Sequence, residues 1–163
     1  MQEWREAWYL LRCRENAWRR TLENLNNVGL KTCCPLIHER RRRKDKKNTF
    51  RLVDSPAFPG YIFVHLNPSQ IHTTAIKRIP GAMDFVHFGN KLATVHHREI
   101  EALRMAEPKV LTADPVSYEC ANLPPELLSK IEEIYTTADP KHRVNLLISM
   151  LALPKRLWSK NAN

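Results

Sequence analysis

Positively charged side chains are the most concentrated chemical feature of this 163-residue sequence. Residues 40–47 read Arg-Arg-Arg-Arg-Lys-Asp-Lys-Lys, and the net charge of the chain is +9. Residues 1–106 hold 19 Lys or Arg against 10 Asp or Glu, whereas residues 107–163 hold 7 of each. Lys and Arg release condensed counterions when they contact phosphates, so a basic region favours DNA or RNA as a partner. The alternative to a specific contact is that residues 40–47 form a solvated basic loop.

A predicted aromatic strand is a second candidate site. Residues 58–60 (Phe-Pro-Gly) indicate a turn, and residues 61–64 (Tyr-Ile-Phe-Val) indicate the strand that follows. Side chains alternate along a strand, so Tyr61 and Phe63 share one face. The opposite face can fill a core, and two aromatics side by side suit a docking surface. Without neighbouring motifs, the same two residues would more often be core.

The remaining reactive side chains predict neither a metal site nor a catalytic one. Cys33-Cys34 is not a Cys-x-x-Cys pair, although nearby His38 keeps a weak metal alternative open. His87, His96 and His97 lack acidic or cysteine partners at ligand spacing. The sequence has no phosphate loop, nucleophile elbow or evident pair of catalytic carboxylates. We therefore expect no enzyme and no cofactor.

The first 106 residues predict one α+β domain. Hydrophobic periodicity and turn signals give the order β-α-β-β-β-α-β-β-α, which suits an antiparallel sheet with helices on its faces. The expected strands are residues 8–13, 30–38, 49–53, 60–66, 85–88 and 92–95, and the expected helices are 15–27, about 67–79 and 97–105. Neither a membrane helix nor a signal peptide is indicated, so we expect a cytoplasmic protein.

The last third predicts two amphipathic helices after a linker at residues 107–122. Asp139-Pro140 separates the helices as a cap and a first helical residue, within a hairpin spanning residues 123–163. Two such helices make too small a core alone, so their apolar stripes need another surface. The aromatic strand is the obvious candidate. The predicted masking residues are Leu127, Ile131, Ile134, Arg143, Val144, Leu147, Ile148 and Leu151.

Three motifs together resemble the NusG family of transcription elongation factors over residues 8 to about 106. They are residues 8–13 (Trp-Tyr-Leu-Leu-Arg-Cys), the Phe58–Val64 stretch and His72-Thr73-Thr74. The last motif resembles the RfaH-like branch, which includes paralogues carried by conjugative plasmids. The resemblance implies a NusG N-terminal-type domain that binds RNA polymerase, suppresses pausing and acts in antitermination.

The resemblance also implies particular contacts. Trp8, Phe58, Pro59, Tyr61 and Phe63 would bind the clamp helices of the largest polymerase subunit. His72, Thr73 and Thr74 would contact the second-largest subunit. Non-template DNA would meet basic residues, for which the candidates are Arg12, Arg14, Arg20, Lys77, Arg78, Arg40, Arg41, Arg42 and Arg43.

The C-terminal region departs from the usual family pattern. Typical members end in a KOW β-barrel whose turns use glycine, and this chain has no glycine after Gly89. The segment resembles instead the helical hairpin that masks the polymerase-binding face in the RfaH-like branch. In that branch the hairpin can refold to a barrel that contacts ribosomal protein S10, and the sequence leaves open whether residues 123–153 ever become β. The resemblance suggests a lock through Arg143, with Ser55 where a carboxylate is usual and Asp54 beside it.

A different class of function is also compatible with these features. A basic DNA- or RNA-binding regulator could use the helical hairpin to dimerise, with salt-dependent binding to free nucleic acid. The masking interpretation predicts a monomer instead.

Overall fold

The computed structural model describes residues 5–42, 44–45, 49–105 and 125–152. A central antiparallel sheet has the strand order β2-β5-β1-β6, and β9 also pairs with β1. Its strands are β1 (Ala7–Cys13), β2 (Lys31–Cys33), β5 (Tyr61–Leu66), β6 (Ala82–Phe85) and β9 (Thr94–Val95). The predicted α+β class with an antiparallel sheet is confirmed.

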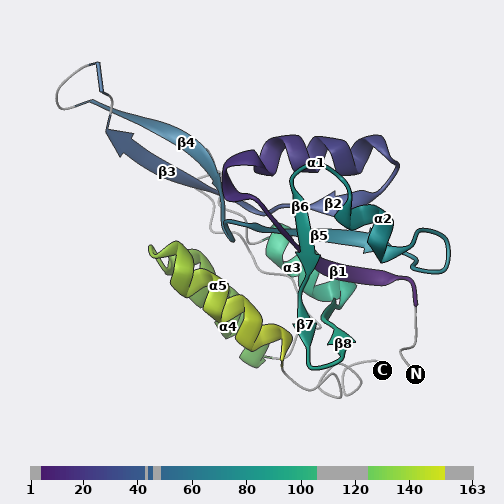
Figure 1. The fold of residues 1–163 in the computed structure, drawn as a ribbon. Helices are drawn as coiled ribbons and strands as arrows, with labels where there is room; N and C mark the ends of the chain where they lie inside the picture. Colours follow the sequence, from purple (N-terminus) through teal and green to yellow (C-terminus); the bar gives the residue numbers. More distant parts are fainter. Residues whose placement is uncertain (1–4, 43, 46–48, 106–124, 153–163) are drawn as a thin grey trace.

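Helices cover both faces of this sheet (Figure 1). A short 3-10 turn, η1 (Glu15–Ala17), leads into α1 (Trp18–Asn27), which lies on one face together with α2 (Thr73–Lys77). The other face carries α3 (His97–Met105), α4 (Pro125–Thr136) and α5 (Pro140–Leu151). Alternation along the strands separates the two cores: the paired Leu11 and Ile62 face α1, whereas the paired Leu10 and Phe63 face the other helices.

A two-stranded arm projects from this body (Figure 1). It consists of β3 (Leu36–Arg42) and β4 (Phe50–Pro56), paired antiparallel from Leu36 opposite Pro56 to Arg42 opposite Phe50. The sequence predicted a single strand over residues 30–38, which is wrong. Pro35 has no N–H to donate to a ladder, so the chain divides there into β2 of the sheet and β3 of the arm.

The helix expected over residues 67–79 is also shorter than predicted. Asn67 instead forms a local turn, because its side-chain Oδ1 accepts the Ser69 N–H at 3.0 Å. The helix α2 begins only at Thr73, where the His72 side chain caps it. The predicted hairpin around Gly89 is present as the short strands β7 (His87–Phe88) and β8 (Lys91–Leu92).

Both predicted C-terminal helices are present, and they form an antiparallel pair without a closed barrel in the described residues. The carboxylate of Asp139 caps α5 by accepting the Lys141 N–H at 3.1 Å. The predicted linker at residues 107–122 lies outside the described residues. Among the helices of the described ranges, none has the length and apolar character that crossing a membrane requires.

Candidate functional site

The strands β1 and β5 build a continuous aromatic face. Their register places Trp8 opposite His65, Leu10 opposite Phe63, and Arg12 opposite Tyr61. Directly opposed residues of an antiparallel pair project to the same side of the sheet. We call the surface formed by Trp8, Leu10, Tyr61, Phe63 and Phe58 the aromatic face.

The turn before β5 brings Phe58 onto this face. Gly60 has φ +87°, a left-handed conformation that L side chains rarely adopt, and its carbonyl accepts the Cys13 N–H at 2.8 Å. The turn is thereby fixed to the end of β1. Phe58 then meets Phe63 edge to face, with ring centroids 6.1 Å apart.

Helices α3, α4 and α5 pack with the aromatic face in one core. Phe58 and Phe63 are 1% and 0% exposed, whereas Trp8 and Tyr61 are only partly buried. Trp8 lies toward α3, with the Arg104 guanidinium 5.6 Å from its ring centroid. The side chains that α4 and α5 add to this core are Leu127, Ile131, Ile134, Leu147, Met150 and Leu151, with Val144 and Ile148 packed at its edge.

Two polar side chains tie the helical pair to the domain beneath it. Arg143 is 2% exposed, and its Nε donates to the Ala57 carbonyl at 2.8 Å. Its Nη1 donates to the carbonyls of Thr137 and Ala138, which close the turn between the helices. The Tyr135 hydroxyl donates to the Leu103 carbonyl at 2.6 Å. We call Arg143 and Tyr135 the latch.

The lock residues suggested on the domain side have other surroundings. Asp54 is half exposed, and its Oδ1 lies 2.5 Å from Nδ1 of His38 on the paired strand of the arm. Ser55 is buried. The main-chain acceptor for Arg143 comes from Ala57, whose own N–H donates to the Pro35 carbonyl at 2.8 Å. Sequence reasoning missed this acceptor, because any residue type could provide it.

The His72-Thr73-Thr74 motif lies at the start of α2. His72 Nδ1 accepts the Thr74 N–H at 3.1 Å, and Thr73 is buried. His72 and Thr74 are exposed. Two of the three predicted contact residues are therefore open to a partner, and the third is structural.

Several predicted nucleic-acid residues gather where α1 meets the turn after α2. The Arg14 N–H donates to the Gly81 carbonyl at 3.0 Å, and Asn24 of α1 donates to the Pro80 carbonyl at 3.3 Å. These bonds place the start of α1, with exposed Arg14 and Arg20, beside the segment that carries Arg78.

Three other basic candidates are placed differently. Arg12 is exposed and lies beside Tyr61, on the aromatic-face side of the sheet rather than the α1 side. Lys77 is engaged with Asp84, and the hydrogen bond from its Nζ at 3.0 Å holds the pKa of the Asp84 carboxyl below its ordinary value. Arg40, Arg41 and Arg42 lie on β3 of the arm. Arg43 lies outside the described residues.

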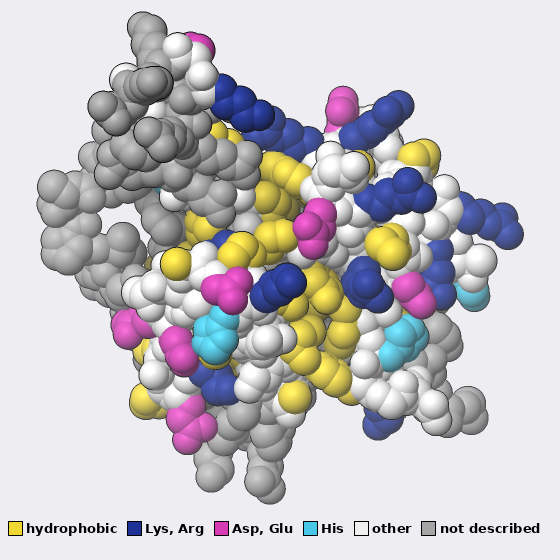
Figure 2. Space-filling view, turned by 60° about the vertical axis from the view of Figure 1, so that its left-hand side comes forward, with side chains coloured by type: hydrophobic (Ala, Val, Ile, Leu, Met, Phe, Trp, Pro, Cys, Tyr) yellow, Lys and Arg dark blue, Asp and Glu magenta, His cyan; other side chains and the backbone are white. Residues whose placement is uncertain are grey.

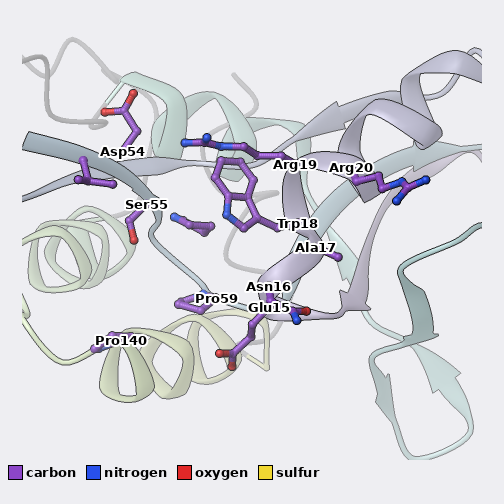
Figure 3. A pocket seen from close by; sticks show the side chains of 12 residues that line it. Glu15, Asn16, Ala17, Trp18, Arg19, Arg20, Asp54, Ser55, Pro59 and Pro140 are labelled. Carbon is purple, nitrogen blue, oxygen red and sulfur yellow. The ribbon is translucent and has the colours of Figure 1, made fainter.

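A hollow opens where α1, the root of the arm and α5 meet. It has a volume of 770 Å³, and Trp18, Arg19, Ser55, Pro59 and Pro140 are among the residues that line it (Figure 3). A second hollow of 540 Å³ adjoins it and reaches Tyr61 and Val144. In Figure 2, hydrophobic side chains run through the centre of this side of the molecule. The sequence analysis did not identify this hollow, whose walls come from three distant segments.

A comparison with models of protein families identifies the family of this chain. Residues 6–104 match the family described as transcription termination factor NusG. The chain belongs to the NusG family. Among solved structures, one similar chain comes from a study of domain interaction in Thermotoga maritima NusG, with a TM-score of 0.39 and 21% sequence identity. That similarity covers 61% of this chain and only 55% of the other chain.

The limits of the NusG match divide the site into two parts. Residues 6–104 include the aromatic face, the His-Thr-Thr motif and the candidate basic residues, whereas α4 and α5 lie beyond the match. The surface therefore lies in the NusG-matched residues, and the helices that pack on it come both from the match, as α3 does, and from beyond it, as α4 and α5 do.

Among the cysteine candidates, Cys33 packs in the core of the aromatic face and stands opposite Phe63 in the sheet. Within the described ranges, His, Cys, Asp and Glu form no group of three that could hold a metal ion. The rings of His96 and His97 contact each other, with their centroids 4.4 Å apart and their planes tilted by 32°. Burial, and secondarily Glu15, raises the pKa of the Cys13 thiol to about 11.

Proposed function

We propose that this NusG-family chain is a transcription elongation and antitermination factor that binds RNA polymerase through its aromatic face. The carrying observation is that Phe58 and Phe63 of the NusG domain are buried in a core to which α4 and α5, outside residues 6–104, contribute side chains. Aromatic side chains, Phe among them, are enriched at the core of protein interfaces. The partner surface is the clamp-helix coiled coil of the largest subunit, and Tyr61 and Pro59 at the open edge meet it first.

The second proposed polymerase contact is made by His72 and Thr74. Both are exposed at the start of α2, which lies on the α1 side of the sheet. A factor that contacts the second-largest subunit here and the clamp helices through the aromatic face would bridge the cleft of the enzyme. Such a bridge stabilises one conformation of polymerase by differential binding and involves no chemistry on a substrate.

The basic residues at the start of α1 are proposed to contact non-template DNA. Arg14 and Arg20 are exposed beside the Pro80-Gly81 turn, close to Arg78. Arg40, Arg41 and Arg42 of β3 are further proposed contacts to DNA. Lys77 contributes less, because Asp84 already neutralises part of its charge.

We propose further that the chain is a specialised RfaH-like paralogue of the plasmid-transfer kind, in which α4 and α5 autoinhibit polymerase binding. Their apolar stripe is used within the same chain, which favours a monomer. The alternative regulator would need that stripe for dimerisation. We do not propose contact with ribosomal protein S10.

The proposal is tested by measuring binding of the full chain to RNA polymerase with and without its clamp helices. Tyr61→Ala is the informative variant, because Tyr61 is partly exposed, whereas Phe63 is fully buried and its loss would disturb the fold. Val28→Ala removes an exposed apolar side chain at the far end of α1 and serves as the matched control.

We expect binding to require the clamp helices and to weaken about tenfold in Tyr61→Ala, as for an interface anchor. The Val28→Ala variant should bind as the unmodified chain does. Binding that ignores both the clamp helices and Tyr61 would overturn the proposal and favour the nucleic-acid regulator.

A further inference from the structure

The hollow between α1, the arm and α5 combines features that suit a planar, partly polar ligand. Trp18 lies on one side, and Pro56 and Pro59 contribute apolar walls (Figure 3). Asn16 and Ser55 add hydrogen-bonding groups. The volume of 770 Å³ falls within the roughly 300–1,000 Å³ typical of ligand sites.

The indole of Trp18 has a guanidinium over its ring that another group can displace. The Arg19 guanidinium lies 5.0 Å from the ring centroid, and Arg19 is exposed. Exposed cation–π contacts are weak compared with the stacking of a nucleobase on an aromatic ring. A base could therefore take the place of the guanidinium, and Arg19 could turn to the adjacent phosphate.

The charges around the hollow select a nucleotide over a simple anion. Arg19 and Arg20 supply cations at the border of the hollow, and Glu15 and Asp54 supply carboxylates. The carboxylates would repel a bare phosphate, but either can accept a hydrogen bond from the amino group of a base such as cytosine. The arrangement fits a base inside the hollow and phosphates outside it.

We propose that this hollow binds a nucleobase of single-stranded DNA, with Trp18 as the stacking platform. The inference rests on the proposed function only in taking the non-template strand as the natural source of that base. The site is distinct from the basic surface at the Pro80-Gly81 turn, because its walls come from α1, β4 and α5.

The position of the hollow makes DNA binding depend on the closed form of the protein, in which α4 and α5 lie on the aromatic face. Pro140 of α5 completes one wall, and the adjoining hollow adds Asp139 and Lys141 beside Tyr61. These walls exist together only while α5 lies on the aromatic face. The closed chain is thus the form that has the complete base site, and DNA would bind it before polymerase displaces the helices.

The test uses the full chain and a fluorescent octamer of deoxycytidine, without polymerase. An octamer of abasic deoxyribose phosphates provides the same charge without bases. Trp18→Leu removes the aromatic ring, Trp18→Phe keeps one, and Lys91→Gln removes an exposed cation on the distant β8 strand as a charge control.

We expect Trp18→Leu to weaken binding of the deoxycytidine octamer about tenfold, the effect of losing one stacked base. Trp18→Phe should retain most of the affinity, which would exclude a folding defect at this position. Lys91→Gln should lower the affinity for both octamers slightly and equally.

The proposal is overturned if the abasic octamer binds as tightly as the deoxycytidine octamer, or if Trp18→Leu binds as the unmodified chain does. Because polymerase is absent, either result leaves the aromatic-face proposal standing. Conversely, a chain that binds the octamer through Trp18 but ignores the clamp helices would refute only the proposed polymerase contact.

Discussion

The two faces of the central sheet are closed in different ways, although the same strands supply both. Toward α1, residues such as Leu11 and Ile62 are covered by elements within the matched NusG domain. Toward the other side, Leu10 and Phe63 share a core with α3 of the matched residues and with α4 and α5, which follow them. One core therefore lies within the matched residues, and the other also includes an additional segment.

Burial alone does not separate a permanent core from the docking surface that we propose for the aromatic face. Leu11 and Phe63 are both 0% exposed. The difference lies in the origin of the covering element and in the polar contacts that hold it. On the α4–α5 side, the latch donates to main-chain carbonyls of the NusG domain.

The largest expected effects come from the same substitution made on each side of the sheet. Leu11→Ala and Leu147→Ala each remove a fully buried side chain, a change that costs about 2–5 kcal/mol. For Leu11→Ala we expect this loss in the free energy of unfolding of the whole domain. For Leu147→Ala we expect the same loss in the free energy with which α4 and α5 dock on the domain. Denaturant unfolding and amide hydrogen exchange of α4 and α5 measure the two quantities.

The Leu147→Ala variant should also bind polymerase more tightly than the unmodified chain, because released helices no longer cover the aromatic face. Leu11→Ala should give no such gain. Equal loss of global stability in both variants, without faster exchange in α4 and α5, would contradict the distinction between the two cores.

Substitution of the latch should release the helical pair without disturbing the α1 side. Arg143→Met keeps an apolar stem but removes the donors, and should weaken docking by about 1.5–3 kcal/mol, as for a hydrogen bond to a charged group. Tyr135→Phe should cost about 0.5–1.5 kcal/mol. Hydrogen exchange of α4 and α5 checks both values. An Arg143→Met chain that stays as closed as the unmodified one would show that packing alone holds the pair.

Substitutions at two glycines test the packing on the α1 side of the sheet. Gly81 has φ +92°, and a Cβ there would collide with the Thr21 side chain of α1. Gly89 has φ +63° with open space around it. Left-handed backbone alone costs roughly 1–2 kcal/mol, so Gly89→Ala should lose about that amount and Gly81→Ala more. Thermal unfolding measures both, and neither variant should expose the aromatic face.

The smallest effect is expected at the suggested carboxylate lock. Asp54→Asn changes a half-exposed side chain in contact with His38, while the Ala57 carbonyl remains available to Arg143. Exposed ion pairs contribute about 0–1 kcal/mol, so hydrogen exchange of α5 should change little. A large increase in exchange would show that Asp54 supports the latch after all.

Much of this architecture could be predicted from periodicity and capping residues. The alternation at Tyr61 and Phe63 gave the two faces of β5, and Asp139-Pro140 marked the start of α5. These features depend on local sequence. The helix expected at residues 67–79 failed for a local reason as well, because the Asn67 side chain competes with helix formation by bonding its own neighbours.

Features that depend on distant main-chain atoms could not be predicted. The acceptor for Arg143 is a carbonyl 86 residues away, and a carbonyl leaves no trace in residue type. The position of Arg12 beside Tyr61 required the register of β1 against β5. The hollow between α1, the arm and α5 could not be predicted either. It is formed by the joint placement of α1, β4 and α5, and the sequence of one element gives no information on where the others lie.

The main-chain acceptor at Ala57 limits which substitutions can remove the hydrogen bond to Arg143. Every amino acid carries a carbonyl, so no single substitution at position 57 deletes the group that Arg143 binds. The donors, in contrast, belong to two particular side chains, Arg143 and Tyr135. A genetic selection for chains that are active without recruitment should therefore return mutations of Arg143 and Tyr135, rather than of Ala57 and Leu103, which carry their acceptors.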